Sequence, residues 1–319
     1  MTDPIKLRVI FMGTSVFAER ILDALLGQKY NIISVYTRSD KKTGRDNVLK
    51  KSAVKILAEK NKLKIFEIEK FDEKTVEDVR TQKPDLIIVA AYGKILPASV
   101  LSIPGFGCLN VHASLLPKFR GPSPIQNAIL SGETESGATI MLMDAGIDTG
   151  DILSEIKTEI SPHETYESLQ EKISKLSSAL LLKTLDAWVE RKIQARPQDD
   201  SKATYCQLIE RQDGQIIWAK DASAIYNRYR AFQPWPGIFT FWGVGEYNLR
   251  LKLHRISLAK NNAQANHKIG EVFKLNEAVA VQTGHGAILL EELQLEGKDK
   301  TSVSDFLNGH PDFISSVLK

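Results

Sequence analysis

Residues 85–91 read DLIIVAA, with an unbroken apolar run that begins just after Pro84 and Asp85. An apolar run without polar alternation is typical of a strand buried on both faces of a parallel sheet. Similar short segments occur at 8–12, 31–36 and 64–66, and segments with helical apolar spacing alternate with them at 14–26, 53–60 and 73–81. Strands that alternate with short helices predict an α/β fold with an open parallel sheet, in which ligands bind beyond the carboxyl ends of the strands.

The sequence continues this pattern as far as one long helix. Further strands are expected at 108–111, 139–143 and 152–158. Residues 165–191 have the spacing of an amphipathic helix, whose apolar stripe we expect to lie in the core. That stripe consists of Tyr166, Leu169, Ile173, Leu176, Leu180, Leu185, Trp188 and Val189.

The composition changes after this helix. Residues 194–213 are polar and include Pro197 and the pair Asp199-Asp200, as is typical of a linker. A short helix is expected at 222–231, followed by β-rich segments at 238–242, 247–256, 269–273, 278–282 and 287–293. Short strands at close spacing predict a small barrel, for which an OB-like barrel is one candidate. We therefore expect a first domain at residues 1–193, a linker at 194–213 and a small β domain at 214–319.

Basic residues gather in two stretches of a chain whose formal net charge is only +3. Residues 38–64 contain ten Lys and Arg against three acids, and residues 220–274 contain nine against three. One interpretation is a local positive surface for a polyanion, and the other is two solvated faces. Composition alone leaves both interpretations open.

Missing motifs argue against several classes of protein. The chain has neither a secretory signal nor a run long enough to span a bilayer, so we expect a cytoplasmic monomer without a membrane partner. Gly13 is a lone glycine after the first strand and begins neither a dinucleotide nor a triphosphate motif. A G-x-S-x-G elbow is also missing. Two cysteines without ligand spacing and six histidines without an i, i+4 pair predict no metal site.

The segment richest in chemical groups is the polar, glycine-punctuated stretch 107–151. Asn110 and His112 lie two residues apart at the end of an expected strand, so their side chains point to one face. Asp148 lies 36 residues after His112, in a loop just past the next strand, and two strand ends can bring the three groups together. The set suits an amine that attacks a formyl or similar carbonyl. Asn110 and a protonated His112 can donate to the oxyanion, and Asp148 can accept the proton of the amine, directly or through a water.

A structural interpretation of the same residues stands beside the catalytic one. Asn110 can pair with the backbone, His112 can be a partly buried residue whose nitrogens are satisfied, and Asp148 can form a turn before Thr149. Spacing alone leaves both interpretations open.

The same segment resembles the signature of the 10-formyltetrahydrofolate-dependent formyltransferases. Residues 110–126 read NVHASLLPKFRGPSPIQ, and residues 143–151 read MDAGIDTGD. Residues 11–14 (FMGT) and 90–97 (AAYGKILP) are similar to the family as well. Residues 231–237 (AFQPWPG) resemble the members that act on methionine-charged initiator tRNA. The resemblance covers nearly the whole chain, and its central motif is highly specific.

The resemblance implies a fold, a site and two partners. It implies a Rossmann-like catalytic domain, a linker and an OB-like domain that contacts tRNA, with Asn110, His112 and Asp148 in the roles given above. The co-substrate is 10-formyltetrahydrofolate, whose pterin is expected against the backbone around residues 92–96 and 141–144. The implied folate site consists of Tyr92, Gly93, Ile95, Leu96, Ser114, Leu115, Leu116, Pro117, Met143 and Asp144. The acceptor end of the tRNA is expected at the loop with Gly44, which provides Lys41, Lys42 and Arg45.

Three positions depart from the family pattern. Ser15 stands where the family usually has proline, and Asp46 adds a negative charge beside Arg45 in the basic loop. Leu208 occupies the place of an expected linker lysine, so a phosphate contact of that lysine must come from elsewhere. The departures at Asp46 and Leu208 concern the tRNA contacts, and neither touches the three candidate catalytic residues.

The combined expectation is transfer of a formyl group from 10-formyltetrahydrofolate to the α-amino group of methionine on initiator tRNA. Within the same chemistry, the alternatives are a small amine acceptor such as an amino sugar, or hydrolysis of a formyl folate. From another class, the alternative is a protein that binds folate or tRNA without catalysis. The barrel and its basic residues favour tRNA, and the intact polar trio favours an enzyme.

Overall fold

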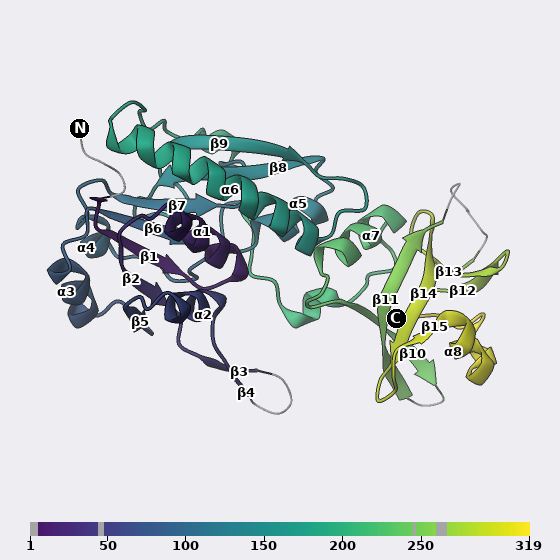
Figure 1. The fold of residues 1–319 in the computed structure, drawn as a ribbon. Helices are drawn as coiled ribbons and strands as arrows, with labels where there is room; N and C mark the ends of the chain where they lie inside the picture. Colours follow the sequence, from purple (N-terminus) through teal and green to yellow (C-terminus); the bar gives the residue numbers. More distant parts are fainter. Residues whose placement is uncertain (1–5, 44–47, 245–246, 260–266) are drawn as a thin grey trace. The chain divides into compact units, whose positions relative to one another are not determined.

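The computed structural model of the chain describes residues 6–43, 48–244, 247–259 and 267–319 (Figure 1). These residues form two compact units. Unit 1 contains the chain up to Ile125, Glu135–Ile160 and Ser168–Leu208, and unit 2 contains Gln126–Thr134, Ser161–Glu167 and Ile209–Lys319. In this division the expected linker, residues 194–213, is shared between the units, because most of it pairs with loops of unit 1.

The sheet of unit 1 contains β1 (Val9–Gly13), β2 (Ile32–Thr37), β5 (Ile65–Glu67), β6 (Leu86–Ala90), β7 (Cys108–His112), β8 (Glu135–Leu142) and β9 (Ile152–Glu159). Its order is β5-β2-β1-β6-β7-β8-β9 (Figure 1). The strands from β5 to β7 run parallel, whereas β8 is antiparallel to both of its neighbours. The expected open, mostly parallel sheet is confirmed.

Helices cover both faces of this sheet. They are α1 (Val16–Gly27), α2 (Ala53–Lys60), α3 (Glu73–Thr81), α4 (Ala98–Leu101) and α6 (Tyr166–Val189). Ile10 and Met12 share a core with residues of α3 and α4. The intervening Phe11 points to the opposite face because side chains alternate along a strand. α1 packs against β1 and β6, and Ser178 of α6 donates to the carbonyl of Arg20 of α1 at 3.4 Å.

The turn between β1 and α1 depends on Gly13 and Ser15. A Cβ on Gly13 would lie 2.9 Å from the carbonyl oxygen of Ala90 and 2.7 Å from the Cβ of Ala18. Glycine therefore allows the helix to begin this close to the strands. Ser15, where the family usually has proline, is the N-cap of α1 and its Oγ accepts from the amide of Ala18 at 3.3 Å.

The buried stripe of α6 differs from the expected one. Leu169, Ile173, Leu185 and Val189 are buried as expected, but Leu176, Leu180 and Trp188 are only partly buried. Small and polar residues share the buried face with Leu181: Ser174, Ser177 and Thr184. The expectation was wrong there because it counted only apolar residues, whereas close packing against β9 admits small hydroxyl side chains. The Oγ of Ser154 in β9 lies 2.5 Å from Oγ1 of Thr184.

Unit 2 contains an antiparallel sheet, the helices α7 and α8, and residues 126–130 of α5 (Pro124–Leu130). The strands are β10 (Ile238–Val244), β11 (Tyr247–Leu258), β12 (Val272–Leu275), β13 (Ala278–Gln282), β14 (Ala287–Leu295) and β15 (Thr301–Ser302). Their order is β10-β11-β14-β13-β12, and β15 pairs with β14. α7 (Ala222–Ala231) begins and ends at the expected residues, whereas α8 (Val303–Gly309) was not expected from the sequence.

The last residues of the chain connect the two outer strands of this sheet. Lys319 exchanges backbone hydrogen bonds with Phe241 of β10, at 2.9 and 3.1 Å. Leu318 donates to the carbonyl of Gly270 at 2.8 Å, and Val272 of β12 donates to Ser316 at 2.9 Å. The segment therefore closes the sheet into a barrel and leaves neither β10 nor β12 as an open edge.

The remaining elements are short. β3 (Lys41–Thr43) pairs with β4 (Val48–Lys50), and α5 (Pro124–Leu130) follows the signature motif. Two 3₁₀ turns, Asp200–Lys202 and Arg211–Gly214, lie in the expected linker. Among the described residues, no helix combines the length and apolar character needed to cross a membrane.

The corrected stripe of α6 predicts a difference between two neighbouring leucines. Leu181 is fully buried, so Leu181→Ala removes core contacts and is expected to lower the free energy of unfolding by about 2–5 kcal/mol. Leu180→Ala is the matched control and is expected to cost clearly less, because its side chain is only partly buried. Thermal and urea unfolding, followed by circular dichroism, measure both. Equal losses in the two variants would contradict the observed stripe.

Candidate active site

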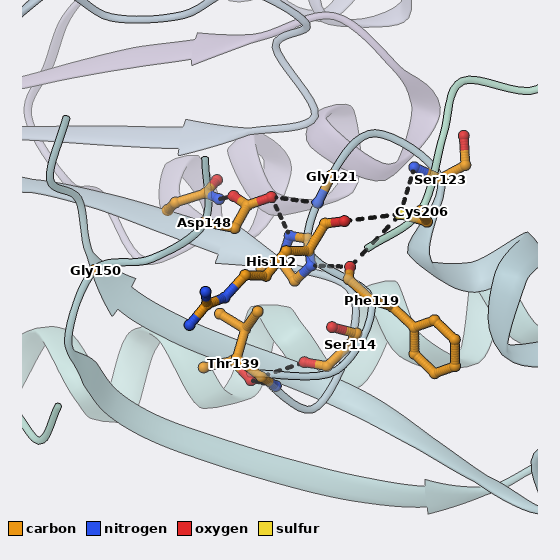
Figure 2. A network of polar contacts seen from close by, with 12 residues as sticks. His112, Ser114, Phe119, Gly121, Ser123, Thr139, Asp148, Gly150 and Cys206 are labelled. Carbon is orange, nitrogen blue, oxygen red and sulfur yellow. Dashed lines mark hydrogen bonds and ion pairs between the residues drawn. The ribbon is translucent and has the colours of Figure 1, made fainter. Parts of the chain in front are cut away.

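Asn110 and His112 lie at the carboxyl end of β7, on the same face of the sheet. Asp148 lies in the loop between β8 and β9. Because β8 runs antiparallel to β7, Leu142 pairs with Leu109 and the amide of Met143 donates to Cys108, so that loop starts beside the first residues of β7. It then runs back to place Asp148 beside Asn110 and His112. The structure therefore brings together the three residues that the sequence analysis singled out, and Figure 2 shows His112 beside Asp148. Asn110 and His112 are buried, with 9% and 5% of their surface exposed.

The carboxylate of Asp148 is the shared partner of this group. Its Oδ1 accepts a hydrogen bond from Nδ2 of Asn110 at 3.1 Å. Its Oδ2 accepts from the backbone amide of Gly121 at 2.8 Å and lies 3.6 Å from Nδ1 of His112 (Figure 2). Both oxygens are thus oriented by donors from separate segments, which fixes the plane of the carboxylate.

The ring of His112 is oriented by a second contact. Its Nε2 lies 2.9 Å from the carbonyl oxygen of Phe119. A carbonyl oxygen only accepts, so Nε2 carries the proton in this contact. Nδ1 then faces Asp148 as a donor when the ring is doubly protonated.

The segment 117–121 supplies two of these contacts, and sequence analysis did not assign them a role. Gly121 has a φ of +113°, and a Cβ there would lie 2.5 Å from the carbonyl oxygen of Cys206. Glycine is therefore required for the amide to reach Asp148. Phe119 and Gly121, which make the two contacts, both lie inside the signature motif 110–126, and this motif was the available sign of their role. The contacts use backbone groups, which a pattern of side chains does not reveal.

The first expected folate segment presents backbone and one apolar side chain. Tyr92 and Leu96 point into the core beneath α3 and α4, with 3% of each exposed, so neither side chain is available to a ligand. Gly93 is exposed and has a φ of +75°, and Ile95 is 75% exposed. The hydroxyl of Thr14 donates to the carbonyl of Tyr92 at 3.1 Å and fixes the start of the loop.

The other expected folate residues mainly shape their own loops. Oγ of Ser114 donates to the carbonyl of Lys118 at 2.6 Å, and Leu116 packs into a small core that Met143 borders. Leu115 and Pro117 are partly buried. Oδ1 of Asp144 accepts from the amide of Gly146 at 3.1 Å and from the hydroxyl of Thr149 at 2.7 Å. Asp144 therefore orders the turn that leads to Asp148.

The expected tRNA contacts are described only in part. Lys41 and Lys42 lie in β3, and Arg45, Gly44 and Asp46 lie outside the described residues. Leu208, in place of the expected lysine, is 68% exposed.

The chain matches known families along most of its length. A model of the formyl transferase family matches residues 5–185, and a model of the formyl transferase C-terminal domain matches residues 208–311. The chain belongs to the formyl transferase family. It shares this membership with full-length relatives. The methionyl-tRNA formyltransferase of Geotalea uraniireducens (strain Rf4) is 39% identical over 314 residues, which cover 98% of each chain. That of Caldicellulosiruptor saccharolyticus is 42% identical over 306 residues, which cover 95% of this chain and 96% of the relative.

Solved structures with lower identity share the fold of this formyl transferase. The N-formyltransferase from Helicobacter canadensis, in complex with folinic acid and dTDP-3-aminofucose, has a TM-score of 0.65 at 19% identity. The match covers 89% of this chain and 98% of that one. HypX from Aquifex aeolicus, in complex with tetrahydrofolic acid, has a TM-score of 0.62 at 18% identity, over 94% of this chain and 47% of that one.

Both cysteines are free thiols close to this site, and their burial predicts low reactivity. Cys108 begins β7, and burial raises its pKa to about 12. Burial also raises the pKa of Cys206, whose Sγ lies 3.3 Å from the carbonyl of Arg120 and accepts from the amide of Ser123 at 3.4 Å (Figure 2). Only the thiolate is a nucleophile, so a raised pKa lowers reactivity.

We expect neither thiol of the folded formyl transferase to react quickly with Ellman's reagent at pH 8. At that pH a thiol of pKa about 12 is roughly one part in ten thousand thiolate. Reactivity is expected to rise with pH and to reach two thiols per chain in 6 M guanidinium chloride. Rapid labelling of a thiol in the folded protein at pH 8 would contradict the burial.

Proposed function

We propose that this formyl transferase moves the formyl group of 10-formyltetrahydrofolate to the α-amino group of methionyl initiator tRNA, in the cytoplasm and in support of translation initiation. The observation that carries the reaction is the contact of Asn110 and His112 with the carboxylate of Asp148. The names of the full-length relatives at about 40% identity support the acceptor. Residues 231–237, with the PWPG element, are a second support for it.

The first requirement of the reaction is stabilisation of an oxyanion. Attack of the amine nitrogen on the formyl carbon forms a C–N bond and places negative charge on the formyl oxygen. The amide of Asn110 has two N–H groups and uses one on Asp148, which leaves the other for the oxyanion. Protonated His112 supplies a positive charge at the same place. Such donors act strongly because their positions are fixed before the reaction.

The second requirement is movement of protons. The attacking amine must lose a proton, and Asp148 accepts it directly or through one water. Collapse of the tetrahedral intermediate breaks the bond between the formyl carbon and N10 of the folate, and N10 gains a proton. The sum is one proton lost by the amine and one gained by N10, with no covalent enzyme intermediate and no metal ion.

The third requirement is placement of both substrates. The exposed backbone around Gly93 and Ile95 and the segment 141–144 form the proposed pterin contacts, together with Leu115 and Pro117. Tyr92, Leu96, Ser114 and Leu116 shape these loops from behind, and Met143 and Asp144 belong to the proposed contact segment. Lys41, Lys42 and Arg45 are the proposed tRNA contacts, and contact with phosphates makes binding salt-dependent. Remote binding energy of this kind positions the amine at the formyl carbon.

The proposed roles predict the effect of removing each group. His112→Ala and Asp148→Asn are each expected to lower kcat at least 100-fold, because the oxyanion donor or the proton acceptor is lost. Asn110→Ala is expected to act in the same direction. Folding and tRNA binding are expected to survive. Formation of N-formylmethionine, measured with labelled formyl folate, tests this. Near-normal turnover in His112→Ala or Asp148→Asn would rule out the mechanism.

The acceptor is tested separately from the chemistry. We expect formylation of methionine on initiator tRNA, and far less on elongator tRNA or on an amino sugar nucleotide. Arg45→Ala is expected to raise KM for tRNA at least 10-fold without changing KM for folate, because a phosphate or base contact is lost. Lys62→Ala, an exposed basic residue beyond α2, is the control. If the enzyme prefers the amino sugar nucleotide, that compound replaces tRNA as the proposed acceptor. If the KM for tRNA is unchanged in Arg45→Ala, this loop is not a tRNA contact.

A further inference from the structure

The backbone of Asp148 has an unusual conformation. Its φ is +53°, in the left-handed region that non-glycine residues seldom adopt. Such a conformation persists only where the surroundings hold it in place. Asn110, Gly121 and His112 contact the carboxylate, so the restraint on the main chain must come from another residue.

Gln198 provides that restraint from a segment far along the sequence. Its Nε2 donates to the carbonyl oxygen of Asp148 at 2.9 Å and to that of Gly150 at 2.7 Å. The two acceptors lie on either side of Thr149. The two hydrogen bonds therefore fix the direction of the carbonyl groups of Asp148 and Gly150. Both N–H groups of the side-chain amide are used on this one turn.

The other end of the Gln198 amide is held by Arg120. Oε1 accepts from Nε of Arg120 at 3.1 Å and from Nη2 at 2.8 Å. The guanidinium is 1% exposed and also donates to Asp200 at 2.7 Å. Because a guanidinium only donates and a carbonyl only accepts, these partners determine which end of the amide is oxygen and which is nitrogen.

Arg120 adjoins Gly121, whose amide donates to Oδ2 of Asp148. Gln198 therefore connects the two loops that meet at the carboxylate. One loop carries Asp148, and the other supplies a donor to it. A shift of either loop would move the carboxylate away from the ends of Asn110 and His112.

We infer that Gln198 is a positioning residue for the reaction, which holds Asp148 in the geometry that accepts the proton of the amine. This inference rests on the proposed function. Gln198 contacts no reacting atom, and its effect passes through the main chain of Asp148. A misplacement of a reactive group by about 1 Å can cost on the order of 100-fold in activity.

Two substitutions separate the donor side of Gln198 from its acceptor side. Gln198→Glu keeps an oxygen for Arg120 and removes both donors to the turn at Asp148. Gln198→Met keeps a side chain of similar length and removes all four hydrogen bonds of the side-chain amide. If the donors to Asp148 and Gly150 are what matters, both variants lose at least about 10-fold in kcat through misplacement of the carboxylate, with KM for folate within about twofold of the parent. If Gln198 only anchors Arg120, Gln198→Glu retains the parent kcat.

The experiment measures kcat, KM for folate and the thermal unfolding midpoint for the parent, both variants and two controls. Gln194→Met, at an exposed position of the same segment, is expected to be unchanged. Asp148→Asn is included to test the function itself. A normal kcat in Gln198→Glu, or a loss of folding in both Gln198 variants, would overturn the positioning role. An active Asp148→Asn would instead overturn the proposed function, so the two failures are distinguishable.

Discussion

The site depends on the carboxylate of Asp148, because three separate segments of the chain converge on this one residue. β7 brings the amide of Asn110 and the ring of His112, and the signature loop brings the amide of Gly121. Gln198 holds the main chain of Asp148 in its left-handed conformation. A carboxylate with this many fixed neighbours cannot turn toward solvent, and so its position relative to β7 is set by the fold.

The loop after β8 completes this convergence. Since β8 runs antiparallel to β7, Leu142 pairs with Leu109 and the loop 143–151 starts beside the first residues of β7. The loop then returns toward the other end of β7 and places Asp148 beside Asn110 and His112. The buried donors thus lie on β7, and the proposed proton acceptor lies on the loop that follows its neighbour β8. Preorganisation of this kind is the main physical means of stabilising an oxyanion without a metal ion or a covalent intermediate.

Periodicity predicted the elements well where a segment has one clear apolar face. α2, α3 and α7 begin and end at the expected residues, and the run at 86–90 is a buried central strand. It failed on α6, where Ser177 lies in the core and Leu180 lies at its margin, because local spacing does not encode close packing of small side chains. The sequence predicted the proximity of Asn110, His112 and Asp148, but the stated reason, two strand ends at one edge, was wrong. β8 ends beside the start of β7, and the loop after β8 returns to bring Asp148 to the other two residues. Gln198 could not have been predicted, because its partners lie 48 to 78 residues away and are backbone or guanidinium groups.

The placement of the formyl group is the most direct test of this view of the site. A crystal structure of the protein with a hydrolysis-resistant 10-formyl folate analogue would measure it. We expect the pterin against the backbone of residues 92–96 and 141–144, and the formyl oxygen at about 3 Å from the Asn110 amide and the His112 ring. We also expect an open approach to the formyl carbon beside Asp148. An analogue bound with its formyl group away from these three side chains would contradict the central role of the Asp148 carboxylate.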